Sequence, residues 1–309
     1  MLRLSIIVPF YNVEPYIEEC VRSLYNQDIP QEEYEVICVD DCSPDNSTSI
    51  VKRLQTEYPT LRLINHDRNR KQGGARNTGL MAAQGIYVWF VDSDDFIYPN
   101  VLGLMLETIE TNALDILQFD YNREMESISK QWQLSEIKSG EAYLFDHVSQ
   151  DWFDKISGPW RQLFSRDFLL ANQLRYIEGV MYEDTDYMLQ AFLLAEKVQH
   201  ISIEAYHYRI NNESVTKTHI SPIKLAWQVN QMERCAKLTN LTESSIARNT
   251  IQEMVANSFS QLRKEVKNLT LIKKMEYFHY LAINDKGCRQ LVSWRTWLAI
   301  RYGITIFIQ

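Results

Sequence analysis

The sequence predicts an α/β fold, with a mostly parallel β-sheet covered by helices on both faces and a helical region after it. Over residues 1–220, short and nearly continuous apolar runs alternate with stretches of helical periodicity. Strands that are buried on both faces of a parallel sheet have this pattern. From about Pro222 onward the periodicity is helical throughout. We therefore place a domain boundary near residue 220, between an α/β domain (1–220) and a helical C-terminal region (221–309).

Each predicted strand is an apolar run with a turn or helix signal behind it. The expected strands are residues 4–10, 34–41, 61–66, 86–92, 114–121 and 201–210. A helix opens at Glu14-Pro15, where proline suits a first turn, and "CSPDNS" supplies capping residues for the next helix, which ends before Pro59. Further helices are expected at residues 73–85, which are rich in small side chains and closed by Gly85, and at 101–110 and 183–197.

Composition and charge restrict the class of protein. Hydrophobic residues make up 45% and charged residues 23% of the 309, as in ordinary soluble domains. The five cysteines are odd in number and scattered, which favours reduced thiols and a cytoplasmic location. The N-terminal apolar run reads as a core strand and not as a signal peptide. Residues 221–309 contain 13 Lys/Arg and 6 Asp/Glu, whereas the whole chain has a net charge of −8. Residues 221–309 are therefore basic and residues 1–220 strongly acidic.

The segment "FVDSDD" places Asp92, Asp94 and Asp95 directly behind a buried strand. Other polar groups lie at strand ends, at residues 9–12, 40–45 and 67–77. The carboxyl ends of parallel strands form the ligand crevice of such sheets. Neither GxGxxG nor GxxxxGKS follows a strand, so a phosphate ligand would need another device. A Mg²⁺ or Mn²⁺ ion held by one or two carboxylates would neutralise the phosphate in that case. The alternative is a polar turn that caps the following helix.

Several motifs in order carry a resemblance to a known family. They are "LSIIVPFYNVEPYIEECVRSLYNQ", "VICVDDCSPDNS", "NRKQGGARNTGL", "GIYVWFVDSDDFIYPN", "WRQLF" and "MYEDTDY". Over about residues 4–216 the chain resembles the family two glycosyltransferases of the GT-A fold, in particular bacterial enzymes of capsule, exopolysaccharide or lipopolysaccharide assembly. The resemblance implies inverting transfer of a sugar from a nucleoside-diphosphate donor, expected to be UDP-linked, to an acceptor hydroxyl.

The resemblance also assigns roles to residues. The donor-binding set that it implies is Pro9, Tyr11, Asn12, Asp41, Arg76, Asp92, Ser93, Arg209 and Ser214, with the metal on Asp94 and Asp95. Within that set the "PFYN" strand end and Asp41 contact the base, with Arg76 near the same pocket. Asp92 approaches the ribose, and Arg209 and Ser214 reach the diphosphate.

"YEDTDY" resembles the acidic base motif of the family, which nominates Asp184 as general base with Glu183 as its positioner, although the two can exchange roles. Without the other motifs, an acid at a helix N-terminus would be the better reading of Asp184. His207 is a candidate extra metal ligand, but a histidine between two tyrosines in a strand is more often packed. One departure from the family lies in the loop between Asn69 and Arg76, which commonly has a glycine near position 71, where this chain has Lys71. This departure leaves the donor sugar open.

Two other functions remain to be separated from this one. A sugar-phosphate nucleotidyltransferase has a similar sheet but needs a glycine-rich basic loop after its first strand, which "PFYNVEP" does not provide. A non-catalytic sugar-nucleotide-binding protein would not need the acids at 41, 92, 94 and 184. The expected partners are the nucleotide sugar and a saccharide or lipid-linked saccharide acceptor, and no nucleic acid. The C-terminal "SWRTWLAIRYGITIFIQ" mixes aromatic and cationic residues, which suits peripheral contact with the inner face of the cytoplasmic membrane, or a last helix packed on the core.

Overall fold

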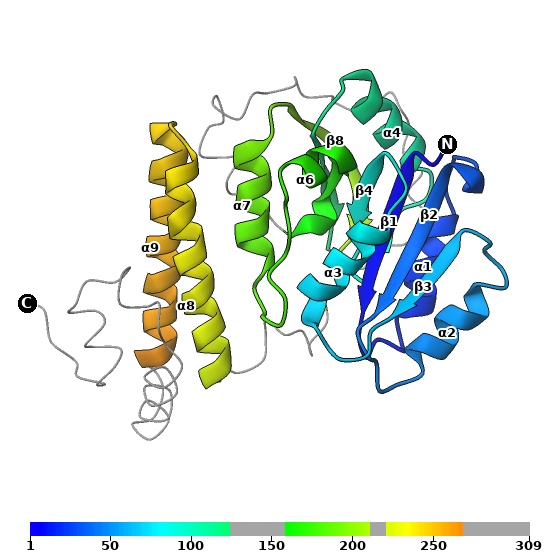
Figure 1. The fold of residues 1–309 in the computed structure, drawn as a ribbon, viewed down its shortest axis with the longest axis horizontal. Coiled ribbons are helices and arrows are strands. Elements are labelled where there is room, and N and C mark those ends of the chain that lie inside the picture. The colour runs from blue at the N-terminus through cyan, green and yellow to red at the C-terminus, as the bar shows by residue number, and fades with distance from the viewer. Residues whose placement is uncertain (124–157, 211–220, 268–309) are drawn as a thin grey trace, which may run out of the picture.

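A computed structural model of the protein describes residues 1–123, 158–210 and 221–267, and these form an α/β domain with a helical pair beside it (Figure 1). One eight-stranded sheet has the order β3-β2-β1-β4-β7-β6-β8-β5. Its strands are β1 (Leu4–Phe10), β2 (Tyr34–Asp40), β3 (Leu61–Asn65), β4 (Tyr87–Phe90), β5 (Phe96–Ile97), β6 (Ile116–Asn122), β7 (Gln162–Ser165) and β8 (Val198–His207).

Most of the sheet is parallel, as predicted. The pairs β1–β2, β2–β3, β1–β4 and β6–β8 are parallel, whereas β7 runs antiparallel to β4 and β6, and β5 runs antiparallel to β8. The two short strands β5 and β7 were not predicted, and β8 begins at Val198 instead of Ile201. Strands of two and four residues are too short to show a periodicity of their own, so only pairing with neighbours defines them.

Helices cover both faces of the sheet. The α-helices are α1 (Ile17–Tyr25), α2 (Ser47–Leu54), α3 (Lys71–Ala82), α4 (Leu102–Thr111), α6 (Arg166–Ala171), α7 (Asp184–Leu194), α8 (Pro222–Lys237) and α9 (Ser245–Lys267), with 3₁₀ turns η1 (Gln31–Glu33), η4 (Pro159–Arg161) and η5 (Leu238–Leu241). Successive side chains of a strand point to opposite faces, and the buried positions of the central strands are mainly apolar on both faces. Thus Ile6 and Val8 join one apolar cluster and Ile7 joins the other.

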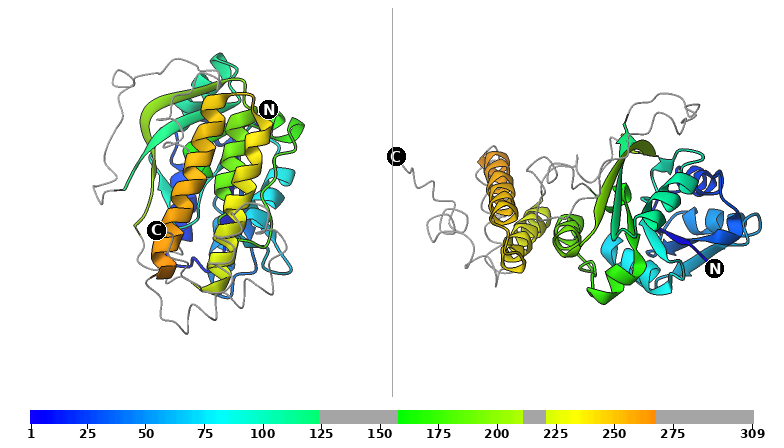
Figure 2. Two further views of the ribbon diagram at one scale, coloured as in Figure 1. Left: turned by 90° about the vertical axis from the view of Figure 1, so that its left-hand side faces the viewer. Right: turned by 90° about the horizontal axis from the view of Figure 1, so that it is seen from above.

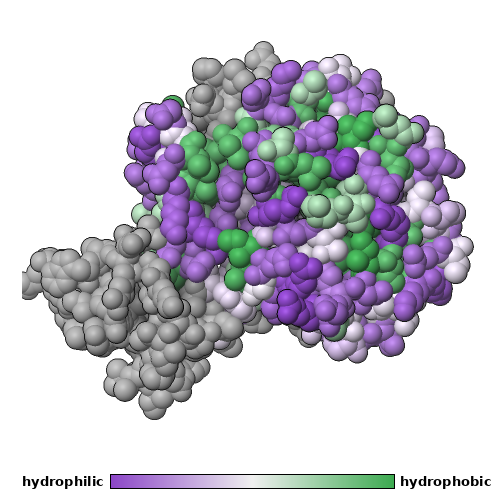
Figure 3. Space-filling view, viewed as in Figure 1, coloured by the Kyte–Doolittle hydropathy of each residue, from purple (hydrophilic) through white to green (hydrophobic). Residues whose placement is uncertain are grey.

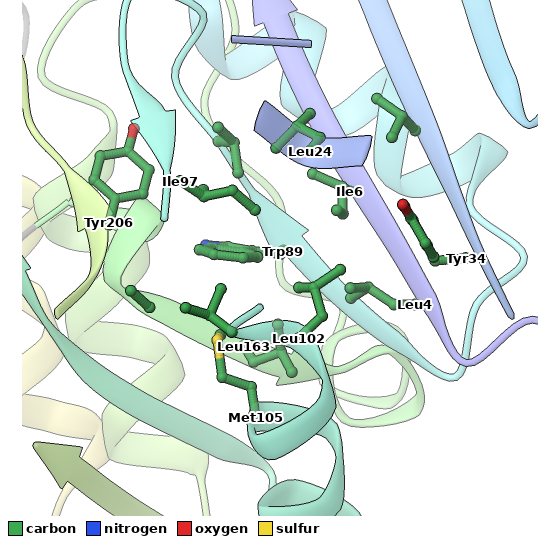
Figure 4. Close-up of a cluster of buried hydrophobic side chains, with 14 of the residues drawn as sticks. Leu4, Ile6, Leu24, Tyr34, Trp89, Ile97, Leu102, Met105, Leu163 and Tyr206 are labelled. Atoms are coloured by element: carbon green, nitrogen blue, oxygen red, sulfur yellow. The ribbon is translucent and has the colours of Figure 1, made fainter. Parts of the chain in front are cut away.

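The first apolar cluster lies between the sheet and helices α1, α2 and α4 (Figure 4). Trp89 of β4 is its largest fully buried side chain, and its indole N–H donates to the carbonyl oxygen of Trp160 at 2.8 Å. The ring of Trp160 in turn stacks on Tyr206 at 4.7 Å. Replacing a buried tryptophan with alanine typically destabilises a domain by about 3–5 kcal/mol. This cluster therefore fixes the position of Tyr206, which lies close to the site described below.

The second apolar cluster lies on the other face, beneath α3, α6 and α7, and extends into the C-terminal helices. Cys235 of α8, Leu238, and Ala247 and Ile251 of α9 are buried in the same cluster as Met188 of α7. Figure 2 shows α8 and α9 side by side outside α7, on the side away from β1. The helical pair thus packs on the α/β domain through α7, the helix that begins at Asp184.

The visible surface is mainly hydrophilic, with smaller hydrophobic patches between the polar regions (Figure 3). The large apolar side chains that the structure shows as exposed are Met1, Tyr11, Met81, Ile86, Ile177, Ile210, Leu241 and Ile246. Within the described ranges, none of the helices has both the length and the apolar content needed to cross a membrane.

Candidate active site

The acidic turn after β4 is built against the end of β8. Both oxygens of the Asp95 carboxylate accept hydrogen bonds, one from the Tyr206 hydroxyl at 2.6 Å and one from the backbone N–H of Arg209 at 2.8 Å. The Tyr206 hydroxyl also accepts from the backbone N–H of Asp92 at 3.2 Å. Asp95 is 2% exposed. Its contacts therefore hold the turn in place, although sequence reasoning grouped it with Asp94 as a metal ligand.

Asp94 differs from Asp95 because its carboxylate is partly exposed and accepts no hydrogen bond from another residue in the described part of the chain. Burial, together with the neighbouring Asp92 carboxylate, raises the pKa of Asp94 to about 6. Burial, followed by Asp94 and Asp92, raises the pKa of Asp95 to about 8. Crowded carboxylates of this kind are stabilised by a nearby cation. Over the described residues, no three or more His, Cys, Asp or Glu side chains gather closely enough to enclose a metal ion.

Asp41 lies at the end of β2 and is 3% exposed. Its Oδ1 accepts from the backbone N–H of Arg70 at 2.7 Å and lies 2.8 Å from Nδ1 of His66, while the Asn69 amide donates to the Asp41 carbonyl at 3.1 Å. The second nitrogen of His66 lies 2.8 Å from the Thr78 hydroxyl. His66 and Arg70 thus orient Asp41, and neither was singled out from the sequence.

The end of β1 is joined to the loop after β2. Pro9 is buried in β1, whereas Tyr11 is 48% exposed. Asn12 has φ of 56°, and its backbone N–H donates to the Ser43 hydroxyl at 3.2 Å. Tyr11 therefore presents an accessible ring beside the carboxyl ends of β1 and β2, where the sequence placed the donor base.

Arg76 is the central cation of the site. Its Nη1 donates to Glu183 at 2.7 Å and its Nη2 donates to Asp92 at 2.8 Å, while the guanidinium lies 5.2 Å from the ring centre of Tyr176. Arg76 is 2% exposed. The sequence placed it near the donor pocket. In the structure its two terminal nitrogens are instead engaged by carboxylates, so that Arg76 ties the turn after β4 to the start of α7.

Glu183 and Asp184 have different surroundings although they are adjacent. Glu183 is 4% exposed and paired with Arg76. Burial raises the pKa of Glu183, the Arg76 guanidinium opposes that rise, and Asp184 adds to it. Asp184 is partly exposed, and its Oδ1 accepts from the backbone N–H of Thr185 at 2.9 Å. Of the two, Asp184 is the acid that a ligand can reach.

The loop before α7 is held by residues from α3 and from the segment before it. Arg70 forms a two-pronged ion pair with Glu178, at 2.7 and 3.0 Å, and the Asn77 amide donates to the carbonyl of Tyr176 at 2.8 Å. A Cβ on Gly73 would lie 2.5 Å from the carbonyl oxygen of Ile177. The glycine therefore permits a close approach of α3 to this loop, and the small-residue run "GGARN" was the sequence signal for it.

Four other predicted residues complete the description. Arg209 donates through Nε to the Asp94 carbonyl at 2.9 Å and through Nη2 to Glu19 at 2.7 Å, so it too braces the acidic turn. The His207 ring stacks on the Phe96 ring, with the ring centres 4.3 Å apart. His207 is therefore packed in the strand, which is the alternative to a metal ligand. Ser93 is buried in the acidic turn, and Ser214 lies outside the described residues.

Lys71 has φ of 63°, in the left-handed region. Backbone of this kind favours glycine, which gives a physical reason why a glycine is common at this position in the family that the sequence resembles.

Comparisons with known proteins were made on both sequence and structure. The profile of Glycosyl transferase family 2 matches residues 5–170. The Bacillus subtilis glycosyltransferase EpsJ is 33% identical over 225 residues, which span 71% of this chain and 64% of EpsJ, slightly less than two thirds of that relative's length. The poly(ribitol-phosphate) beta-glucosyltransferase of Bacillus spizizenii is 26% identical over 91% of this chain and 44% of its own.

Among solved structures, Staphylococcus aureus TarS 1–349 in complex with UDP-GlcNAc superposes with a TM-score of 0.71. Sequence identity to that protein is 24%, and the superposition covers 91% of this chain and 80% of the other. The GT-A architecture expected from the sequence is thereby confirmed.

Proposed function

This chain belongs to glycosyltransferase family 2, and from that premise we propose that it transfers a sugar from a nucleoside-diphosphate donor to an acceptor hydroxyl with inversion at the anomeric carbon. The observation that carries the proposal is the buried bridge Asp92–Arg76–Glu183. It joins the acidic turn after β4 to the N-terminus of α7, although Asp92 and Glu183 lie far apart in the chain. Two partly exposed acids lie close to this bridge in the sequence. Asp94 is two residues after Asp92, and Asp184 directly follows Glu183.

The donor end of the site is assigned to the first two strands. Tyr11 offers an exposed ring for a nucleobase, and Asp41 is a buried acceptor oriented by His66. Only one oxygen of Asp92 is engaged by Arg76, so its carboxylate retains acceptor capacity for a ribose hydroxyl. We propose a UDP-linked donor.

Asp94 is the residue that fits a metal best. Mg²⁺ and Mn²⁺ are commonly held by one or two carboxylates and complete their coordination with phosphate oxygens, so a single accessible carboxylate suits a cation shared with the donor. When bound, such an ion neutralises the charge of the departing diphosphate. Asp95, with both oxygens already accepting hydrogen bonds, is better suited to orienting the turn.

Asp184 is proposed as the general base that takes the proton of the acceptor hydroxyl as that oxygen attacks the sugar. Arg76 supports this role by partly neutralising Glu183 and Asp92. Without Arg76, the carboxylates of Asp92, Glu183 and Asp184 would repel one another and the diphosphate of the donor.

We propose that the acceptor is a saccharide or a lipid-linked saccharide in the assembly of a bacterial surface polysaccharide. The relatives support this class: the Bacillus spizizenii protein is named a poly(ribitol-phosphate) beta-glucosyltransferase, and it aligns with 91% of this chain. A lipid-linked acceptor would require the enzyme to work at the inner face of the cytoplasmic membrane.

The test is incubation of the protein with a panel of UDP-, GDP- and dTDP-sugars in Mn²⁺ or Mg²⁺, with and without acceptor extracts. We expect nucleoside diphosphate as product. In a parallel incubation with a sugar phosphate and a nucleoside triphosphate, release of pyrophosphate would indicate a nucleotidyltransferase instead. Binding of a nucleotide sugar without any turnover would indicate a non-catalytic protein. EDTA should abolish turnover, and Asp94→Ala should have the same effect. Undiminished turnover in EDTA would contradict the metal assignment.

A further inference from the structure

Arg234 of α8 contacts the segment that carries the proposed base. Its Nε donates to Asp186 Oδ2 at 2.9 Å and its Nη2 donates to Asp186 Oδ1 at 2.9 Å, a two-pronged pair in the first turn of α7. The same Nη2 donates to the carbonyl oxygen of Tyr182 at 3.2 Å. Asp186 is 3% exposed, and the Arg234 side chain is 13% exposed. The Arg234 guanidinium therefore forms hydrogen bonds with the chain on both sides of Glu183 and Asp184.

The backbone at Tyr182 needs such support. Its φ is 62°, a conformation that is uncommon for residues other than glycine and that is unfavourable for a bulky aromatic residue. Strained backbone of this kind persists only where surrounding contacts determine it. Arg234 supplies one of those contacts directly, at the Tyr182 carbonyl.

The turn is held from the opposite side as well. Arg76 pairs with the Glu183 carboxylate at 2.7 Å. Asp184 lies between the groups held by Arg76 and those held by Arg234, and its own carboxylate forms no ion pair with any residue that the structure describes. Its direction is consequently set by the backbone that these two arginines hold.

We propose that Arg234 is a positioning residue for Asp184, so that the C-terminal helix α8 is part of the catalytic apparatus and not only a cover for α7. The inference rests on the proposed function, in which Asp184 is the base. Arginine is suited to the task, since its planar fork binds a carboxylate with two parallel hydrogen bonds and still has a donor for a carbonyl. A lysine can keep the charge but not this geometry.

The test compares Arg234→Ala and Arg234→Lys with Arg248→Ala in the full-length protein. Arg248 is a matched control because it lies in α9 and donates to the carbonyl of Thr242, away from the base. The probes are UDP-glucose and UDP-N-acetylglucosamine with Mn²⁺, and the readouts are kcat for UDP release and the Kd of UDP. Misplacing a catalytic group by about 1 Å can reduce the rate ~100-fold. We expect kcat to fall by about 10- to 100-fold in both Arg234 variants, while the Kd of UDP changes less than about twofold.

Chemical rescue separates positioning from general loss of structure. Guanidinium ion at millimolar concentration should restore part of kcat to Arg234→Ala, whereas uncharged urea at the same concentration should not. An unchanged kcat in Arg234→Ala, or a fall equal to that of Arg248→Ala, would overturn the inference.

Hydrogen exchange of residues 180–188 provides a measurement that does not need turnover. Exchange there should accelerate in Arg234→Ala and remain unchanged in Arg248→Ala, and equal exchange in all three proteins would overturn the inference. If the wild-type protein released no UDP from any sugar, the proposed function would fail, and hydrogen exchange would still decide whether Arg234 holds the turn.

Discussion

At the scale of single residues, the site is a set of acids that differ in what already engages them. Asp92, Glu183 and Asp186 are each paired with an arginine, and both oxygens of Asp95 accept hydrogen bonds. Asp94 and Asp184 instead have partly exposed carboxylates that form no ion pair within the described residues. An accessible carboxylate is free to bind a cation or to accept a proton, and an engaged one serves mainly to fix the geometry. The proposed roles of Asp94 and Asp184 thus rest on this difference in surroundings as well as on the sequence motif.

Asp184→Asn should remove the base while preserving side-chain size. We expect transfer to fall by about 100-fold or more, typical of a lost general base, with the Kd of the nucleotide little changed. Asp167→Asn is the matched control, because Asp167 is an exposed acid in the first turn of α6 and its loss removes a similar interaction with a helix dipole. Wild-type transfer by Asp184→Asn would move the base role to Glu183 or elsewhere.

Cation binding at Asp94 should depend on pH. Because the pKa of Asp94 is raised to about 6, this carboxyl keeps its proton to a higher pH than an ordinary aspartate and must release it before it can bind a metal. Affinity for Mn²⁺ in the presence of UDP should therefore be weaker at pH 5 than at pH 7.5, by about tenfold for the unit below the pKa. Isothermal titration at the two pH values measures it. If Asp94→Asn bound Mn²⁺ as tightly as the wild type, another residue would be the ligand.

At the scale of secondary-structure elements, helix α3 organises both halves of the site. Its N-terminal end contacts the Asp41 loop through Arg70, its middle carries Arg76, and its glycines allow close packing on β1 and on the loop before α7. A helix with glycines on its inner side can approach a strand and a loop at once, because Gly79 leaves room for the Ile7 side chain of β1 and Gly73 leaves room for the Ile177 carbonyl. The approach brings Arg76 within reach of both Asp92 and Glu183.

Gly73→Ala should disturb this packing. The new Cβ would lie 2.5 Å from the Ile177 carbonyl oxygen and 3.0 Å from Cγ of Glu183, and a backbone oxygen cannot move aside cheaply. We expect a loss of about 1–3 kcal/mol in the free energy of unfolding, as for overpacked cores, together with lower turnover. Gly103→Ala in α4 is the control, because the three atoms nearest to its new Cβ all belong to the Asp28 carboxylate, the end of a side chain, and none of them is a backbone atom. Urea denaturation of both variants checks the difference, and equal stability would show that the loop before α7 yields easily.

At the scale of the whole molecule, charge is distributed unevenly along the chain. Residues 221–309 hold 13 Lys/Arg against 6 Asp/Glu, in a chain whose total charge is −8. Helices α8 and α9 share a buried apolar cluster with α7, so these two helices and the helix that begins at Asp184 belong to one packed body. A surface bound by α8 or α9 would thus lie at a fixed distance from Asp184.

Attraction of the full-length protein to anionic membranes is the prediction at this scale. Basic segments are drawn to anionic lipid by roughly 1 kcal/mol per Lys or Arg near the surface. Co-sedimentation with anionic vesicles should therefore exceed that with neutral ones and weaken at high salt. The C-terminal stretch containing Arg295 and Arg301, which lies outside the described residues, is tested by the double substitution R295E/R301E. Equal and negligible binding to both kinds of vesicle would contradict membrane docking.

Three features could be predicted from the amino-acid sequence: the class of fold, the order of the main strands and helices, and the positions of the acids at strand ends. These features depend on periodicity and on motifs within about a dozen residues, which a single chain displays directly. The strands at Phe96–Ile97 and Gln162–Ser165 escaped prediction because they exist only by pairing with partners elsewhere in the chain.

Which polar groups are engaged and which are accessible depends on contacts between distant parts of the chain. Arg76 reaches Glu183 across 107 positions of sequence, and Arg234 reaches Asp186 across 48. No local pattern marks either contact. The free energy of burying a charge depends on the partner that packing places beside it, so the same aspartate or arginine can brace a turn or face a ligand. Packing of α3, α7 and α8 therefore decides which of these acids are engaged and which are accessible, and the proposed roles rest on that difference.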